Sequence, residues 1–281
     1  MGVIRFNFLS QYLGFQTNVT ICLPTFSFAD VMKGTTQPYV PGMKYQSLLL
    51  LHGGSGDDSD YLHFSSIVRY ADDHKVAVIM PSDYNADYTD SPTGPKYLRY
   101  VAEELPLVCR TLFPLSEKRE DNFIGGLSMG SHGAMKIALL YPERFAAALV
   151  MSGAARHPDT VATGMRPMRP AGMDPDIMPM PDIQAIYGDA QRYAKSRDNA
   201  YKAAAENVAA GKPLPRFFFA CGDKDFALDR CRQGHDELQK LGYYVSFELT
   251  PGYGHEWDFW DLTLRKAIGE WLPLRRATIL P

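Results

Sequence analysis

Residues 122–130 read Asn-Phe-Ile-Gly-Gly-Leu-Ser-Met-Gly. The first four form a short run typical of a buried strand, and residues 129–140 have the pattern of a helix that stops before Pro142. The turn between them matches Gly-x-Ser-x-Gly, with Ser128 at its centre. A strand, a tight turn and a helix form the setting of a nucleophile elbow, where small flanking residues let strand and helix pass closely. This stretch therefore predicts that Ser128 is a nucleophile.

The segments on both sides of this stretch alternate between buried strands and amphipathic helices. We expect strands at residues 6–8, 18–23, 47–51, 76–80, 122–125, 146–151, 217–221 and 245–249. We expect helices at residues 62–74, 97–113, 129–140, 182–210, 229–241 and 257–271. This alternation predicts an α/β fold, with a mostly parallel central sheet flanked by helices. Functional groups in such sheets gather where strands end.

Length and composition limit the class of protein. The 281 residues are expected to form a single domain, 1–281, in which residues 153–215 are a cap-like insertion over the site, after the sixth strand. A hydrophobic fraction of 46% excludes a disordered chain. Lys and Arg number 29 against 32 Asp and Glu, a net charge of −3, which argues against nucleic-acid binding through bulk positive charge.

The sequence also bears on location and redox state. It has no run of ~18 apolar residues that would span a membrane. Residues 1–24 lack the zones of a signal peptide, so we expect a cytoplasmic protein. The four cysteines are scattered and form no Cys-x-x-Cys pair, which predicts free thiols and no zinc site.

A serine hydroxyl is a weak nucleophile near neutral pH unless a base takes its proton. His255 has the best setting of the seven histidines, because it lies in a loop between the last expected strand and the last helix. His132 follows Ser128 by only four residues in one helix, so we expect it to pack or hydrogen-bond locally. The acid that orients the base is expected after strand 217–221, where Asp223 and Asp225 are nearly equal candidates.

Two backbone N–H groups are candidates for an oxyanion hole. The Gly-rich loop 52–56 follows a buried strand and lets the backbone of Gly54 approach a substrate. Met129 begins the helix after Ser128, where N–H groups are unpaired and the helix dipole is positive. His52 is a candidate support for this loop. Phosphate binding is disfavoured, because the loop lacks the lysine and spacing of a P-loop.

Several motifs together resemble the esterase D-like branch of the α/β-hydrolases, which includes bacterial tributyrin esterases and acetyl- or feruloyl-esterases. The resemblance covers about residues 3–272 and is far more specific than the elbow alone. The matching pieces are Leu49–Gly53, Glu103–Pro106, Gly126–Gly130, Gly211–Pro215, Cys221-Gly-x-x-Asp225 and Gly254–Asp261.

The resemblance implies roles for individual residues. Ser128 would be the nucleophile and His255 the base. Asp225 would be the acid, because the family's carboxylate is the last residue of the Cys-Gly-x-x-Asp motif. The N–H groups of Gly54 and Met129 would form the oxyanion hole, and no metal or cofactor would be needed. The chain departs from the family pattern at Ser131, often a glycine in relatives, and at Asp223, often neutral.

The expected function is that of a serine carboxylesterase that hydrolyses short-chain acyl or hydroxycinnamoyl (feruloyl or acetyl) esters through an acyl-enzyme. Its partner would be a small-molecule or carbohydrate ester, without nucleic acid or membrane, and a homo-oligomer is left open. One alternative is an S-formylglutathione hydrolase-type thioesterase. Another is a hydrolase-fold binding protein that lacks catalysis.

The insertion contributes two further expectations. Its methionines either form an adaptable apolar wall of the pocket or pack the insertion's own small core. They are Met165, Met168, Met173, Met178 and Met180. Its arginines are expected to be solvated, unless they meet a polar or anionic leaving group. They are Arg156, Arg166 and Arg169.

Overall fold

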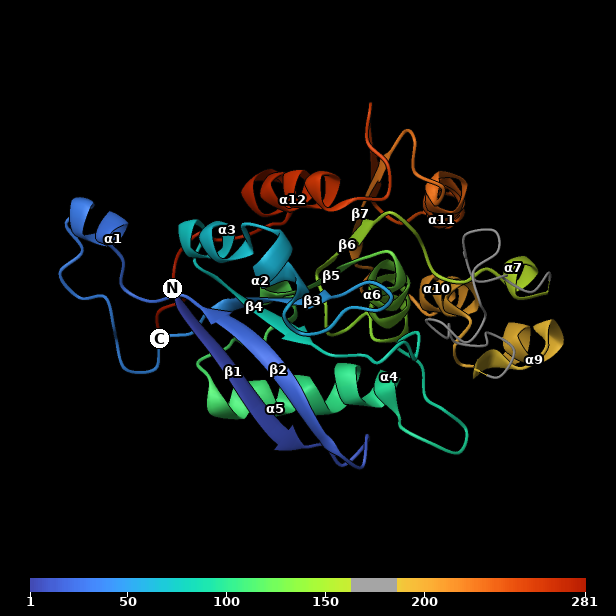
Figure 1. The fold of residues 1–281 in the computed structure, drawn as a ribbon, viewed down its shortest axis with the longest axis horizontal. Coiled ribbons are helices and arrows are strands. Elements are labelled where there is room, and N and C mark those ends of the chain that lie inside the picture. Colours follow the sequence, from blue (N-terminus) through green and yellow to red (C-terminus); the bar gives the residue numbers. More distant parts are fainter. Residues whose placement is uncertain (163–185) are drawn as a thin grey trace.

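The structure is a computed structural model that describes residues 1–162 and 186–281. A single sheet forms the centre of this part of the chain. Its eight strands lie in the order β1-β2-β4-β3-β5-β6-β7-β8 (Figure 1). They are β1 Gly2–Leu9, β2 Gln16–Leu23, β3 Gln46–Leu51, β4 Val76–Pro81, β5 Asn122–Leu127, β6 Ala147–Met151, β7 Arg216–Gly222 and β8 Val245–Thr250. β2 pairs antiparallel with both β1 and β4. All pairs among β3 to β8 are parallel, which confirms the predicted mostly parallel sheet.

The position of each strand in the sheet follows from its side-chain pattern. β3, β4, β5 and β6 are buried along their whole length, as expected for parallel strands covered on both faces. β1 alternates between partly buried and exposed residues, and it lies at the edge of the sheet. The continuous apolar runs therefore occupy the centre.

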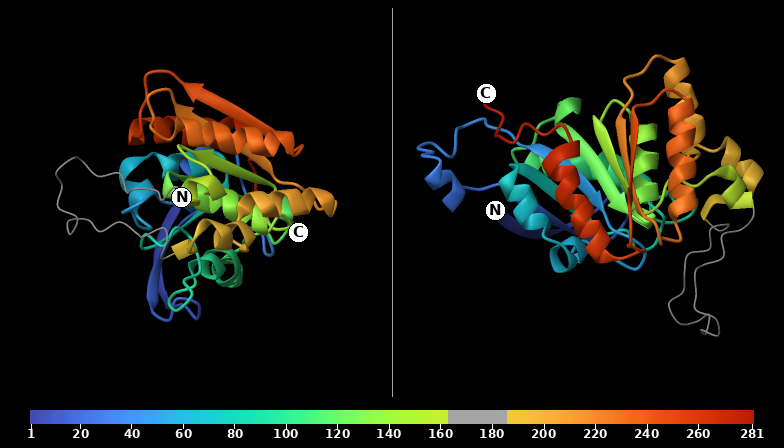
Figure 2. Two further views of the ribbon diagram at one scale, coloured as in Figure 1. Left: turned by 90° about the vertical axis from the view of Figure 1, so that its right-hand side faces the viewer. Right: turned by 90° about the horizontal axis from the view of Figure 1, so that it is seen from above.

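Helices cover both faces of the sheet (Figures 1 and 2). One face packs against α2 Asp60–Phe64, α3 Ile67–Asp73, α12 Trp257–Lys266 and a π-helical turn, Ala267–Trp271. The other packs against α5 Leu105–Leu112, α6 Met129–Leu140, α10 Ala200–Ala209 and α11 Leu228–Lys240. The remaining short elements are α1 Phe28–Met32, α4 Tyr97–Arg99, a π-helical turn Tyr100–Glu104, a 3-10 turn Arg119–Asp121, α7 Pro158–Ala162 and α9 Ala190–Lys195.

Two expected helices, 62–74 and 182–210, are interrupted, and two others, 97–113 and 257–271, contain a π-helical turn. The stretch 62–74 divides into α2 and α3 at an extended Ser65, next to which the Ser66 N–H donates to Asp261 (2.7 Å). The stretch 97–113 contains the π-helical turn that leads into α5. In 182–210, the side chain of Asn199 caps α10 by accepting the N–H of Lys202, so α9 and α10 are separate helices. A long-range hydrogen bond at Ser66 and a capping bond at Asn199 thus accompany the two breaks.

In the sequence, α7, α9 and α10 come between β6 and β7. In space they lie at the opposite end of the molecule from α1 and both termini (Figures 1 and 2). Residues 163–185 of the insertion lie outside the described residues. Its cap-like placement therefore stays a prediction, as do the roles of its methionines, Arg166 and Arg169. In the described ranges, no helix combines the length and apolar character that crossing a bilayer requires.

Candidate active site

The elbow places Ser128 in a strained conformation between β5 and α6. Its φ of 53° and ψ of −117° are rare for a residue with a side chain. The two flanking glycines are required by space. A Cβ at Gly126 would lie 2.3 Å from the carbonyl oxygen of Gly130, and a Cβ at Gly130 would lie 2.1 Å from that of Leu51. Both clashes are with backbone, so only glycine fits.

The loops after β7 and β8 bring an acid and an imidazole to this serine. The Ser128 hydroxyl lies 2.9 Å from Nε2 of His255, and Nδ1 of His255 lies 3.0 and 3.1 Å from the two carboxylate oxygens of Asp225. Asp223 instead accepts the N–H of Gly252 (2.7 Å), which braces the loop that carries the histidine. Of the two carboxylates that the sequence left open, Asp225 is therefore the one that contacts His255.

Asp225 is a buried carboxylate that remains ionised. Burial by itself would raise the pKa of Asp225. Hydrogen bonds from His255, from the Ser152 hydroxyl and from the N–H of Ala227 outweigh burial, and the pKa lies below its ordinary value. A charged Asp225 fixes the His255 tautomer, with the proton on Nδ1 and a free Nε2 facing Ser128.

The loop after β3 crosses directly over the elbow. A Cβ at Gly53 would lie 3.4 Å from the Cβ of Ser128. The next residue, Gly54, is exposed, and the loop is held beyond it by the Ser55 N–H, which donates to Asn85 (2.7 Å). In the described part of the chain, the N–H groups of Gly54 and Met129 form no hydrogen bond. Both N–H groups are therefore free to donate to a ligand.

His52 supports this loop from beneath, as the sequence led us to expect. Its Nε2 accepts the N–H of Asp83 (2.8 Å), so its Nδ1–H donates to the carbonyl of Gly53 (2.7 Å). Burial lowers the pKa of His52, which keeps the ring neutral. The neutral ring ties the loop to the end of β4.

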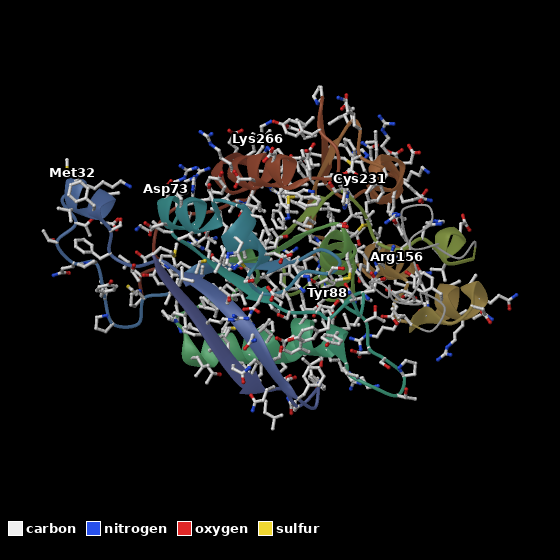
Figure 3. All side chains as sticks on the ribbon, viewed as in Figure 1. Met32, Asp73, Tyr88, Arg156, Cys231 and Lys266 are labelled. Atoms are coloured by element: carbon white, nitrogen blue, oxygen red, sulfur yellow. The ribbon has the colours of Figure 1, made fainter. Side chains whose placement is uncertain are left out.

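Sequence reasoning missed a buried polar cluster around Asp87. Arg156 donates to both carboxylate oxygens of Asp87 (2.9 and 2.8 Å), and the Tyr187 hydroxyl donates to one of them (2.7 Å). Arg156, marked in Figure 3, is thus a buried ion-pair partner, and the expectation that it is solvated or meets a leaving group is wrong. The sequence signal was limited to an arginine in the loop that follows the expected strand 146–151.

The same cluster accounts for His132. Its Nδ1 accepts the N–H of Arg156 (3.0 Å), and its Nε2–H donates to Tyr187 (2.8 Å). Burial lowers the pKa of His132 well below its ordinary value, although Asp87 opposes this shift. His132 therefore has a hydrogen-bonding role, as expected, but its partners lie 24 and 55 positions away in the sequence and are not local. In the described ranges, no group of three or more His, Cys, Asp or Glu is placed to hold a metal ion.

Asp83 makes stability depend on pH. The side chain is fully buried, one oxygen has no partner, and burial raises its pKa to about 7, with a smaller contribution from Asp87 in the same direction. Its pKa in the unfolded chain is about 3.9, so its contribution to stability is largest in acid and is lost as pH rises to about 7. Asp83→Asn should raise the free energy of unfolding at pH 8 by about 2–4 kcal/mol, with a smaller gain at pH 5.

Urea unfolding at pH 5 and pH 8 measures this difference. Asp73→Asn is the matched control, because Asp73 is exposed at the end of α3 (Figure 3). The control should change stability by less than about 0.5 kcal/mol at both pH values. Equal effects of Asp83→Asn at pH 5 and pH 8 would contradict the assignment.

An α/β-hydrolase is the class of protein that this sheet and serine elbow define. The chain belongs to the family described as "Putative esterase", whose model matches residues 25–269. The acetyl esterase of Caldicellulosiruptor saccharolyticus is 30% identical over 274 residues, 97% of this chain and 98% of that one. The protein is therefore a carboxylic ester hydrolase.

Solved structures agree with this assignment. The substrate-bound fluorophosphonate-binding serine hydrolase F of Staphylococcus aureus has a TM-score of 0.79 and 30% identity, and the match covers 95% of this chain and 97% of that one. The S-formylglutathione hydrolase of the same organism has a TM-score of 0.77, with 30% identity and the same coverage. Both likenesses extend over nearly the whole chain.

Proposed function

We propose that this protein is a serine carboxylesterase that hydrolyses short-chain acyl or hydroxycinnamoyl esters through an acyl-enzyme. Ser128 is the nucleophile, His255 the base and Asp225 the acid. The observation that carries the proposal is the continuous chain of contacts from the Ser128 hydroxyl through His255 to Asp225, at 2.9 and 3.0 Å. Three segments distant in sequence have no simpler reason to converge on a strained serine.

The reaction follows from this geometry. Nε2 of His255 takes the hydroxyl proton as the Ser128 oxygen attacks the ester carbonyl carbon. The oxyanion that forms is held by the N–H groups of Gly54 and Met129. His255 then gives its proton to the leaving alcohol as the C–O bond breaks. Water, activated by the same imidazole, releases the carboxylic acid from Ser128.

Two features support small acyl esters with apolar or aromatic alcohols. One relative that matches nearly the whole chain is an acetyl esterase. Phe226 is 52% exposed, and its ring centre lies 4.3 Å from that of His255. Because His255 protonates the leaving group, this ring is placed to contact the alcohol as it departs.

An S-formylglutathione hydrolase activity is the second candidate. It is supported by the 30% identity over 95% of this chain to the Staphylococcus aureus enzyme of that name. The same residues would act at a thioester, with a thiol in place of the alcohol as leaving group. The two candidates therefore differ in the substrate that gives the highest kcat/KM.

A fluorophosphonate probe followed by a substrate panel tests both. The probe should form one covalent adduct, located by peptide mass spectrometry on Ser128. The panel is p-nitrophenyl acetate, methyl ferulate, acetylated xylan and S-formylglutathione, and we expect an oxygen ester to give the highest kcat/KM. A preference for S-formylglutathione would favour the thioesterase. Absence of both adduct and turnover would leave a binding protein.

A further inference from the structure

A tryptophan outside the proposed triad donates to a serine that lies beside the acid of the triad. Trp260 lies in α12, and its indole N–H donates to the Ser152 hydroxyl oxygen at 2.9 Å. An indole N–H can only donate, so the Ser152 oxygen is the acceptor, and its own O–H is free to point to another group. Both side chains are buried, at 6% and 1% exposure, so that group lies within the protein interior.

The backbone of Ser152 directs its hydroxyl to Asp225. Ser152 directly follows β6 with a φ of 54°, and its N–H donates to the carbonyl of Ala220 on β7 (2.9 Å). Left-handed conformations of residues with side chains are unfavourable and persist where the surroundings enforce them. The hydroxyl that this conformation positions lies beside the Asp225 carboxylate and helps to lower the pKa of that carboxylate. The strain thus serves a specific contact.

The same tryptophan contacts the base. The rings of His255 and Trp260 lie 5.0 Å apart at an interplanar angle of 89°, an edge-to-face arrangement. One indole therefore contacts the imidazole through its ring and reaches the carboxylate through Ser152. These contacts involve the end of β6, the loop after β7, the loop after β8 and α12.

We propose that Ser152 and Trp260 are positioning residues that hold Asp225 and His255 in the orientation needed to activate Ser128. The proposal rests on the function proposed above and extends its chain of contacts to Trp260–Ser152–Asp225–His255–Ser128. Asp225 needs such a support, because its two oxygens are almost equally distant from Nδ1 of His255. One of them also accepts the Ala227 N–H (2.8 Å). Cys221 is a further neighbour of the carboxylate, but a thiol is a weak donor.

Ser152→Ala and Trp260→Phe remove the two donors separately. We expect each to lower kcat by about 10- to 100-fold, the usual cost of removing a group that orients a catalytic ligand, with KM within about twofold. A carboxylate that loses a donor holds a proton on the Asp225–His255 pair more tightly, so the acid limb of kcat/KM should move to higher pH. The double variant should be no worse than the worse single variant, because both act through one contact.

Trp257→Phe is the matched control. Trp257 lies on the same helix and packs against the rings of Tyr61, Phe64 and Trp260. It should keep kcat within about twofold, and its acid limb should not move.

Thermal unfolding separates positioning from loss of structure. If either single variant is folded at the assay temperature and shows the lower kcat and the shifted limb, the inference holds. If both keep the wild-type limb and lose kcat only in proportion to the folded fraction, the inference fails. Failure of the proposed function is distinct, because the fluorophosphonate adduct of the wild type would then be absent from Ser128.

Discussion

Ser128→Ala is expected to lower kcat for p-nitrophenyl acetate by about 10⁵- to 10⁶-fold, the loss that follows removal of a triad serine. Without the hydroxyl, His255 has no proton to take from a nucleophile, and no acyl-enzyme forms. The N–H groups of Gly54 and Met129 remain, so the variant should still hydrolyse the ester faster than the uncatalysed reaction in water. Steady-state kinetics with active-site titration measures the effect.

Labelling and stability complete this test. Ser128→Ala should form no fluorophosphonate adduct, and its melting temperature should stay within a few degrees of the wild type, because the strained backbone is kept. Ser246→Ala is the matched control, since Ser246 lies on β8, opposite Phe218 of β7, and has no part in the proposed chemistry. A fully active Ser128→Ala protein would overturn the mechanism.

Gly130→Ala is expected to have the largest effect on stability. The added methyl would lie 2.1 Å from the carbonyl oxygen of Leu51 and 2.6 Å from that of His52. Both atoms belong to the backbone where β3 becomes the loop over the elbow, so no side-chain rotation relieves the overlap. We expect a loss of more than about 4 kcal/mol in the free energy of unfolding, together with loss of esterase activity.

Gly269→Ala is the control for this substitution. Gly269 lies in the π-helical turn after α12, and the nearest atom to an added Cβ is Nε2 of His74 at 3.8 Å. This variant should be as stable as the wild type or more stable by up to about 1 kcal/mol, because alanine favours helical backbone over glycine. Urea unfolding compares the two variants. Equal stability of the Gly130 and Gly269 variants would mean that the elbow tolerates a side chain.

The fold could be predicted because its signals are local. A parallel strand covered on both faces has to be apolar along its length, and β3, β4 and β6 are read as such directly. The elbow needs glycines at fixed spacing from its serine, so its position can be predicted from the Gly-x-Ser-x-Gly motif. The meeting of Ser128 and His255 could be predicted from the rule that parallel strands end at one edge of the sheet.

The choice between two nearby carboxylates could not be predicted from the residues alone. Asp223 and Asp225 lie in one loop, and the path of its backbone decides which faces His255. The N–H of Asp223 pairs with Thr250 of β8, and its carboxylate accepts the N–H of Gly252. The N–H of Asp225 instead donates to the carbonyl of Gly222, and the side chain of Asp225 is buried. Composition and spacing alone do not predict which of the two carboxylates faces His255.

The Asp87 cluster was missed for a different reason. Asp87 and Arg156 are 69 positions apart, and each looks like a solvated loop residue on its own. Burial of such a pair is stable only when geometry and further hydrogen bonds compensate for the lost water, which depends on the assembled structure. Ser152 is similar, because its role follows from a backbone angle that no motif records.

The hydrogen bonds to Asp87 join two segments of the insertion between β6 and β7. Arg156 stands before residues 163–185 and Tyr187 stands after them, and both donate to the one carboxylate. One buried carboxylate therefore anchors both of these segments, and substitution of Asp87 should loosen both together.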